Sequence, residues 1–173
     1  MENKNKLKHI FKAGLTVSAI LTAAFVLTAA STPKTTGDSG WINISAPNAS
    51  QAHTVFNAMN TSAAPGARGA KGSFLYDDGT NIYSMDVKWL KVDGKTARFA
   101  GPVTLNSAGC CAVGHWIFIK IEDNGEPGIG VDRIWGEDLG EIDDTVALAK
   151  VEAGPDPIGG PFVINSGNLQ VKQ

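Results

Sequence analysis

The chain has 173 residues, with 15 Lys and Arg against 17 Asp and Glu, which gives a formal net charge of −2 at pH 7. A chain of this length is expected to form one domain around one core. It contains no run of basic residues. The electrostatic footprint of nucleic-acid-binding proteins is therefore missing, and we expect no nucleic-acid partner.

Residues 1–30 have the organisation of a secretory signal peptide. Four lysines occur among the first twelve residues, residues 13–30 carry no charge, and small side chains follow at 28–31. We expect cleavage after Ala30. The alternative is an uncleaved membrane anchor, because a spanning helix needs about 20 apolar residues, but the many alanines and threonines favour cleavage. The sequence therefore predicts a secreted or cell-surface protein with no membrane insertion after cleavage.

Residues 31–40 are small, polar or charged, and we expect a flexible tether there. From Trp41 onward, apolar residues recur mainly with the period of two that is typical of half-buried strands. A single β-rich domain is therefore expected over residues 41–173.

Residues 81–92 show the clearest strand pattern. Alternate residues from Tyr83 to Trp89 are apolar, and polar residues separate them. The apolar phase shifts by one residue at Leu90, as a β-bulge or a change of sheet requires. Asp93-Gly94 follows, and another β-rich run begins two residues later, so we expect a hairpin at this point.

Residues 115–122 predict a central strand, because both sets of alternating side chains are apolar or aromatic. Weaker strand patterns occur at 41–45, 53–59, 72–77, 132–135, 145–151 and 162–171. After residue 30, no window of a dozen residues has helical periodicity with caps. About nine strands separated by Gly, Pro, Asn and Asp predict an all-β fold, a single antiparallel β-sandwich.

Several segments between residues 71 and 171 resemble a family of secreted bacterial β-rich modules. The earlier ones are Tyr76-Asp77-Asp78, the hairpin 92–97 and Phe99-Ala100-Gly101. The resemblance is sharper at Asp123-Asn124-Gly125-Glu126-Pro127-Gly128, at 132–135 and at Ser166-Gly167-Asn168-Leu169-Gln170-Val171. It implies a β-rich fold and export, and it supplies no activity or catalytic residue. Residues 109–112, with the two cysteines, depart from the family pattern.

The glycine-rich acidic turn is a candidate metal site. Asp123, Asn124, Glu126 and Asp132 place four oxygen-bearing side chains within ten residues, and Ca²⁺ takes six to eight oxygen ligands. The spacing is not that of an EF-hand loop. The alternative is an ordinary hairpin, because turns use the same residue types to satisfy their own backbone.

Cys110 and Cys111 are the only cysteines. In an oxidising compartment they could form a disulfide with each other, pair between chains or stay free. A disulfide between neighbours closes almost no loop, so it would act as a local stiffener or redox element more than as a source of stability. Binding of copper or zinc with His115 is a further alternative, although no third and fourth ligand is visible.

Trp41 and Trp135 are candidate ligand-binding residues. Flat aromatic rings can stack on sugars or anchor a protein partner, and these two lie nearer to predicted strand ends than the other tryptophans. The partner expected for such a surface is a glycan or a surface protein.

The sequence favours an exported, non-catalytic binding or structural module. No catalytic residue is assigned, because no nucleophile elbow, metalloprotease helix or phosphate-cradling loop is present. One alternative is a small secreted hydrolase that uses the acidic turn and His115. Another is a self-associating surface or matrix protein, which would have an uncovered edge strand.

Overall fold

The computed structural model describes residues 34–38, 42–43, 51–61 and 67–173. Within them, strands predominate and one short helix is present, so the predicted all-β fold is confirmed. The elements are β1 (Lys34–Asp38), β2 (Ile42–Asn43), β3 (Gln51–Asn60), β4 (Arg68–Asp77), β5 (Ile82–Asp86), β6 (Trp89–Asp93), β7 (Thr96–Ala108), β8 (Trp116–Glu122), β9 (Arg133–Asp138), α1 (Asp144–Ala153), β10 (Gly159–Val163) and β11 (Asn168–Lys172).

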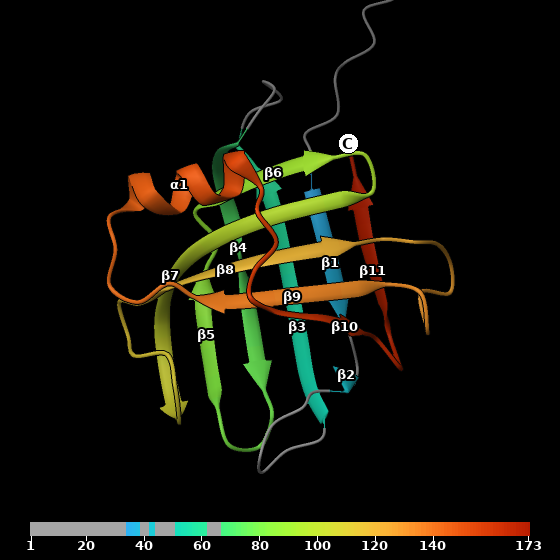
Figure 1. Ribbon diagram of the computed structural model, residues 1–173, viewed down its shortest axis with the longest axis horizontal. Helices are drawn as coiled ribbons and strands as arrows, with labels where there is room; N and C mark the ends of the chain where they lie inside the picture. The colour runs from blue at the N-terminus through green and yellow to red at the C-terminus, as the bar shows by residue number, and fades with distance from the viewer. Residues whose placement is uncertain (1–33, 39–41, 44–50, 62–66) are drawn as a thin grey trace, which may run out of the picture.

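The strands pair antiparallel in the order β10-β9-β8-β7-β5-β4-β3-β1-β11, and they form two layers that cross each other (Figure 1). The long strand β7 belongs to both layers. Its first half pairs with β6 and β8, and its second half pairs with β5. Packing of crossed layers needs strands that bend from one layer into the other. Two register shifts between β5 and β7 provide extra residues in this bent region.

The main core lies between the two layers. Phe56 of β3 and Phe74 of β4 come from one layer, and Ile119 of β8 and Ile134 of β9 come from the other. The ring centroids of Phe56 and Phe99 are 5.3 Å apart. Burial of each such side chain contributes about 1.5–3 kcal/mol to folding, so this interior accounts for the tight contact between layers.

The outer face of β7 and β8 is covered by α1. Ala147 and Val151 of the helix pack with Ala100, Trp116 and Phe118. Every residue of β8 from Trp116 to Ile121 is buried as a result. The prediction of a central strand with two buried faces is therefore confirmed, with the helix as the second cover.

The strand predicted at 145–151 is wrong, because these residues form α1. Alanine, leucine, lysine and glutamate have high helix propensity, and a spacing of four residues places Ala147 and Val151 on one side. Gly154 ends the helix in the left-handed conformation (φ 69°), and its N–H donates to the carbonyl of Lys150. With ten residues, the helix is shorter than the dozen-residue window in which a helical pattern was sought.

The tether expected at 31–40 is also wrong for residues 34–38, which form β1. This strand pairs on one side with β3 and on the other with β11. Thr35 is buried, and its hydroxyl donates to the carbonyl of Gln170 (2.8 Å). Backbone pairing on both edges satisfies the polar main chain whatever the side chains are, which explains why the composition did not indicate a strand.

The phase shift at Leu90 coincides with a change of sheet, one of its two predicted causes. β5 pairs with the second halves of β4 and β7, whereas β6 pairs with the first residues of both strands. The side chain of Leu90 lies in the main core, while Trp89 packs toward α1. The predicted hairpin connects β6 to β7, with Asp93 paired to Thr96 and Gly94 at φ 60°. The run predicted at 162–171 is interrupted and forms β10 and β11.

Candidate functional site: a cavity beside a disulfide

A cavity of about 280 Å³ opens between the two layers. Its lining comes from strands of both layers and from the loop that precedes β8. Five of the fifteen lining residues are aromatic, and the remaining lining includes the two cysteines and the acidic residues Glu137 and Asp138. The aromatic lining residues are Phe74, Tyr76, Tyr83, Trp135 and Phe162. Largely apolar walls with a few polar groups are characteristic of small-molecule sites.

Two stacked tyrosines form part of the wall. The ring centroids of Tyr76 and Tyr83 are 5.2 Å apart, with 21° between the planes. Burial, followed by the negative charge of Asp78, raises the pKa of Tyr76, whose hydroxyl donates to Asp78 Oδ2 (3.0 Å). Burial also raises the pKa of Tyr83, with Asp138 and Asp78 adding to the shift. Both hydroxyls are therefore protonated in neutral solution.

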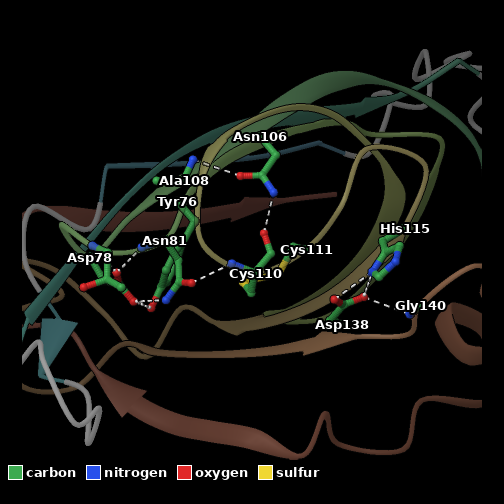
Figure 2. The surroundings of a disulfide bond; sticks show 11 residues. Tyr76, Asp78, Asn81, Asn106, Ala108, Cys110, Cys111, His115, Asp138 and Gly140 are labelled. Atoms are coloured by element: carbon green, nitrogen blue, oxygen red, sulfur yellow. Dashed lines mark hydrogen bonds and ion pairs between the residues drawn. A yellow bond between two sulfur atoms is a disulfide. The ribbon is translucent and has the colours of Figure 1, made fainter.

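Cys110 and Cys111 form a disulfide with each other, which is one of the three states that the sequence left open. The loop that carries them is held from two sides (Figure 2). On one side, Asn81 Oδ1 accepts a hydrogen bond from the N–H of Cys110 (2.8 Å). On the other, Asn106 Nδ2 donates to the carbonyl of Cys110 (2.7 Å). The disulfide is thus a fixed part of the cavity wall.

Gly109 is required for this close approach. Its φ is 78°, and a Cβ at this position would overlap the side-chain oxygen of Asn81 and approach the carbonyl of Thr80. Only glycine combines such a backbone conformation with so little space. The contact between the disulfide loop and the β4–β5 turn therefore depends on Gly109 as well as on Asn81.

Asp78 is the anchor of that turn. Its carboxylate accepts hydrogen bonds from the N–H of Thr80 (2.8 Å), the N–H of Asn81 (2.6 Å) and the side chain of Asn81 (2.9 Å), in addition to Tyr76. Burial alone would raise the pKa of Asp78. The hydrogen bonds, with those from Asn81 the largest, outweigh burial and lower it. A continuous network therefore links Tyr76, Asp78 and Asn81 to Cys110.

His115 follows the disulfide loop, and its Nδ1 lies 3.0 Å from Asp138 Oδ2. Asp138 Oδ1 also accepts a hydrogen bond from the N–H of Gly140 (2.8 Å). The acidic turn lies at the other end of β8, and seven strand residues span about 20 Å. The structure therefore does not bring His115 and the acidic turn together, as the alternative of a hydrolase built on both would need.

The acidic turn forms the β8–β9 loop, and its carboxylates connect this loop to β11 by hydrogen bonds. Asp132 is fully buried, and its carboxylate accepts hydrogen bonds from the N–H groups of Asn124 (2.8 Å) and Leu169 (3.0 Å). Burial raises the pKa of Asp132, although these two amides counteract the shift. Asp123 Oδ2 accepts from the N–H of Val171 (3.1 Å), and Glu126 Oε1 accepts from the side chain of Asn168 (2.9 Å). The carboxylates thus have protein donors as partners.

The calcium hypothesis stays a prediction. In the part of the chain that the structure describes, no group of three or more His, Cys, Asp or Glu side chains is placed to hold a metal ion. The hydrogen bonds of Asp123, Glu126 and Asp132 correspond to the alternative interpretation, in which polar side chains satisfy the backbone of the turn.

Of the two tryptophans predicted to bind a ligand, the structure describes one. Trp41 lies outside the described residues. Trp135 is 5% exposed, and the ammonium of Lys120 lies 4.2 Å from its ring centroid. Lys120 is in turn paired with Glu122 and Asp156. Trp135 contributes to the cavity lining, but it does not present the exposed stacking surface that was expected, because Lys120 faces it from the neighbouring strand.

Sequence analysis missed most of this site. Tyr76 lies in β4, Asp78 and Asn81 belong to the turn between β4 and β5, and Phe162 belongs to β10, far along the chain. The sequence singled out three of the lining residues, Cys110 and Cys111 for their thiols and Trp135 as a candidate ligand-binding residue. It assigned no role in a site to the remaining lining residues.

No protein-family model, no curated protein and no solved structure matches the chain. The resemblance to secreted bacterial β-rich modules therefore remains a prediction. In the described residues, no helix is long and apolar enough to span a membrane. The site has to be interpreted from its own geometry.

Proposed function

We propose that this protein is an exported, non-catalytic binding module that holds a small ligand in the cavity beside the Cys110–Cys111 disulfide. The observation that carries the proposal is the cavity itself, with its aromatic walls and its firmly held disulfide loop. Its volume of about 280 Å³ lies just below the range of about 300–1,000 Å³ of small-molecule sites, as suits a small ligand. Export is supported by the signal-peptide pattern of residues 1–30.

The composition of the lining supports binding without catalysis. Among the described residues, the lining holds no serine, histidine, lysine or free thiol. A serine, lysine or thiol nucleophile beside a histidine base, one common arrangement in covalent catalysis, is therefore not found in this lining. Asp138 and His115 form a pair at 3.0 Å, but the histidine is not part of the lining. The hydrolase thus has less support than a ligand-binding role.

Titration of the ¹⁵N-labelled chain with benzyl alcohol, followed by NMR, tests the proposal. We expect amide shifts to change at Tyr76, Tyr83 and Gly136, with saturation in the millimolar range. Gly136 lines the cavity, and a Cβ there would meet only the end of Ile119, at 3.3 Å. The Gly136→Leu variant should therefore fill the cavity and abolish the shifts.

Gly69→Leu is the matched control, because Gly69 lies on β4 away from the cavity lining, and its Cβ would meet Thr61 at 3.6 Å. This variant should bind benzyl alcohol as the unaltered chain does. The proposal is wrong if the probe leaves the cavity amides unchanged, or if Gly136→Leu binds it equally well.

A further inference from the structure

The charged residues of the cavity lining are all acidic. Glu137 and Asp138 line the cavity, and no lysine, arginine or histidine of the residues that the structure describes does so. Glu137 is matched by Lys150 of α1, whose Nζ lies 3.4 Å from Glu137 Oε1. Within the described part of the chain, His115 is the ionic partner of Asp138, and this pair is charge-neutralised only when the imidazole is protonated. The lining therefore carries a negative charge and no fixed positive one.

A second carboxylate lies behind the aromatic wall. Asp78 accepts the hydroxyl hydrogen bond of Tyr76 and holds the side chain of Asn81, and both of these residues line the cavity. The negative charges of Asp138 and Asp78 both act on the buried hydroxyl of Tyr83. Charges in such a partly desolvated site act more strongly than in bulk water, so the potential inside the cavity favours positive charge.

The aromatic walls favour the same kind of ligand. Tyr76 and Tyr83 present stacked rings, and Phe162 of β10 adds a third ring to the lining. The faces of aromatic rings carry negative charge density and attract organic cations. Tyr83 is buried, with 7% of its surface exposed. Its hydroxyl makes no hydrogen bond with any of the described residues. It is therefore available to a hydroxyl or amine group of a ligand.

We propose that the cavity selects a small organic cation of the alkylammonium class over neutral and anionic molecules of the same size. This inference rests on the proposed binding function and names the ligand class of the same site. Recognition combines the carboxylate of Asp138 with the faces of the two stacked tyrosines, while the disulfide limits the size of the ligand.

Choline and its uncharged isostere 3,3-dimethylbutan-1-ol form the test pair, because they share size and shape and differ in charge. Both are titrated by NMR into the full chain at pH 8, where imidazole side chains carry little charge. We expect choline to bind about tenfold more tightly, because a desolvated cation–π contact and a nearby carboxylate together favour the cation by about that factor.

The Asp138→Asn variant should remove most of this preference and leave the affinity for the isostere unchanged. Its amide can still accept the hydrogen bond from Gly140, so the fold should persist, and the unfolding midpoint checks this. Asp86→Asn makes the same change of charge at an exposed residue outside the lining. It should preserve the full preference for choline.

The outcomes separate the two proposals. Equal binding of choline and its isostere at the cavity overturns the cation selectivity and leaves the binding function standing. A preference that persists in Asp138→Asn also overturns it, because the cation would then be recognised elsewhere. If neither probe binds, the cation selectivity is wrong, and the binding function falls with it only when benzyl alcohol also fails.

Discussion

Asp78 shows how one carboxylate organises the wall of the candidate site. Four hydrogen bonds converge on it from three nearby residues, Tyr76 of β4 and Thr80 and Asn81 of the following turn. Asn81 then holds the N–H of Cys110, 29 residues further along the chain. Asp78 was noted in the sequence only as part of the family resemblance, and in the structure it holds both a tyrosine hydroxyl and, through Asn81, the disulfide loop.

Asp78 also predicts a pH dependence. Its pKa in the folded protein is below the ordinary value of 3.8, so its carboxylate stabilises the fold fully above that value. The contribution is lost as the pH falls through the lower, folded-state pKa. In Asp78→Asn this loss is absent, because an amide does not titrate. We expect the free energy of unfolding to decrease less in the variant than in the unaltered chain between pH 5 and pH 2.

Urea unfolding at a series of pH values measures this difference. Asp77→Asn is the control, because Asp77 accepts one hydrogen bond in the same turn, from the N–H of Gly79 (2.8 Å). The pH profile of the control should follow the unaltered chain. At pH 7, loss of the charged acceptor should make Asp78→Asn less stable by about 1–3 kcal/mol. Parallel pH profiles for all three chains would contradict the role given to Asp78.

At the scale of elements, the β8–β9 loop and β11 act as one unit. The buried carboxylate of Asp132 connects the loop to Leu169, and Asp123 connects it to Val171. Protein donors occupy these oxygens, so the hydrogen-bonded turn explains them without a metal ion. We expect the thermal unfolding midpoint to be the same in millimolar Ca²⁺ and in chelator.

An increase of several degrees in Ca²⁺ would instead establish the metal site predicted from the sequence, because a ligand that binds the folded state stabilises it. Glu126→Gln separates the two interpretations. It keeps an oxygen that accepts from Asn168 and removes a charge that Ca²⁺ needs. A midpoint shift that is present in the unaltered chain and absent in this variant would contradict our expectation.

Elements with strong local patterns could be predicted from the sequence. β8 could be predicted because the side chains on both of its faces are apolar or aromatic. The hairpin at Asp93-Gly94 could be predicted because two neighbouring residues determine the turn. The helix α1 was missed because Ala147 and Val151, its buried residues, also fit a strand pattern. β1 was missed because pairing with β3 and β11 stabilises it, and its own side chains do not reveal these neighbours.

The candidate site could not be predicted, because its lining depends on contacts between distant segments. Tyr76, Tyr83 and Phe162 come from three strands whose meeting is set by the order of the whole sheet. Trp135 was singled out for its position near a strand end. Its burial depends on Lys120, which only the register between β8 and β9 places beside it.

At the scale of the whole molecule, β7 is the strand that joins the two layers. Its pairing changes from β6 and β8 to β5 beside Gly101, where the main chain passes directly against the carbonyl of Asp86. Ala100 and Val103 on either side of Gly101 are buried in different clusters, one beneath α1 and one between the layers. The cavity lies between the same layers, so its shape depends on how closely β7 passes β5.

Gly101→Ala should therefore be among the most damaging small substitutions in the chain. A Cβ at this position overlaps the Asp86 carbonyl, which belongs to the main chain and cannot turn aside as a flexible side chain does. We expect a loss of about 3 kcal/mol in the free energy of unfolding, the upper end of the usual cost of overpacking. Urea unfolding measures it, and Gly69→Ala, where a Cβ meets only ordinary contact distances, should change stability by less than about 1 kcal/mol. If both variants were equally stable, the main chain of β7 would not pass as closely against the Asp86 carbonyl as the structure has it.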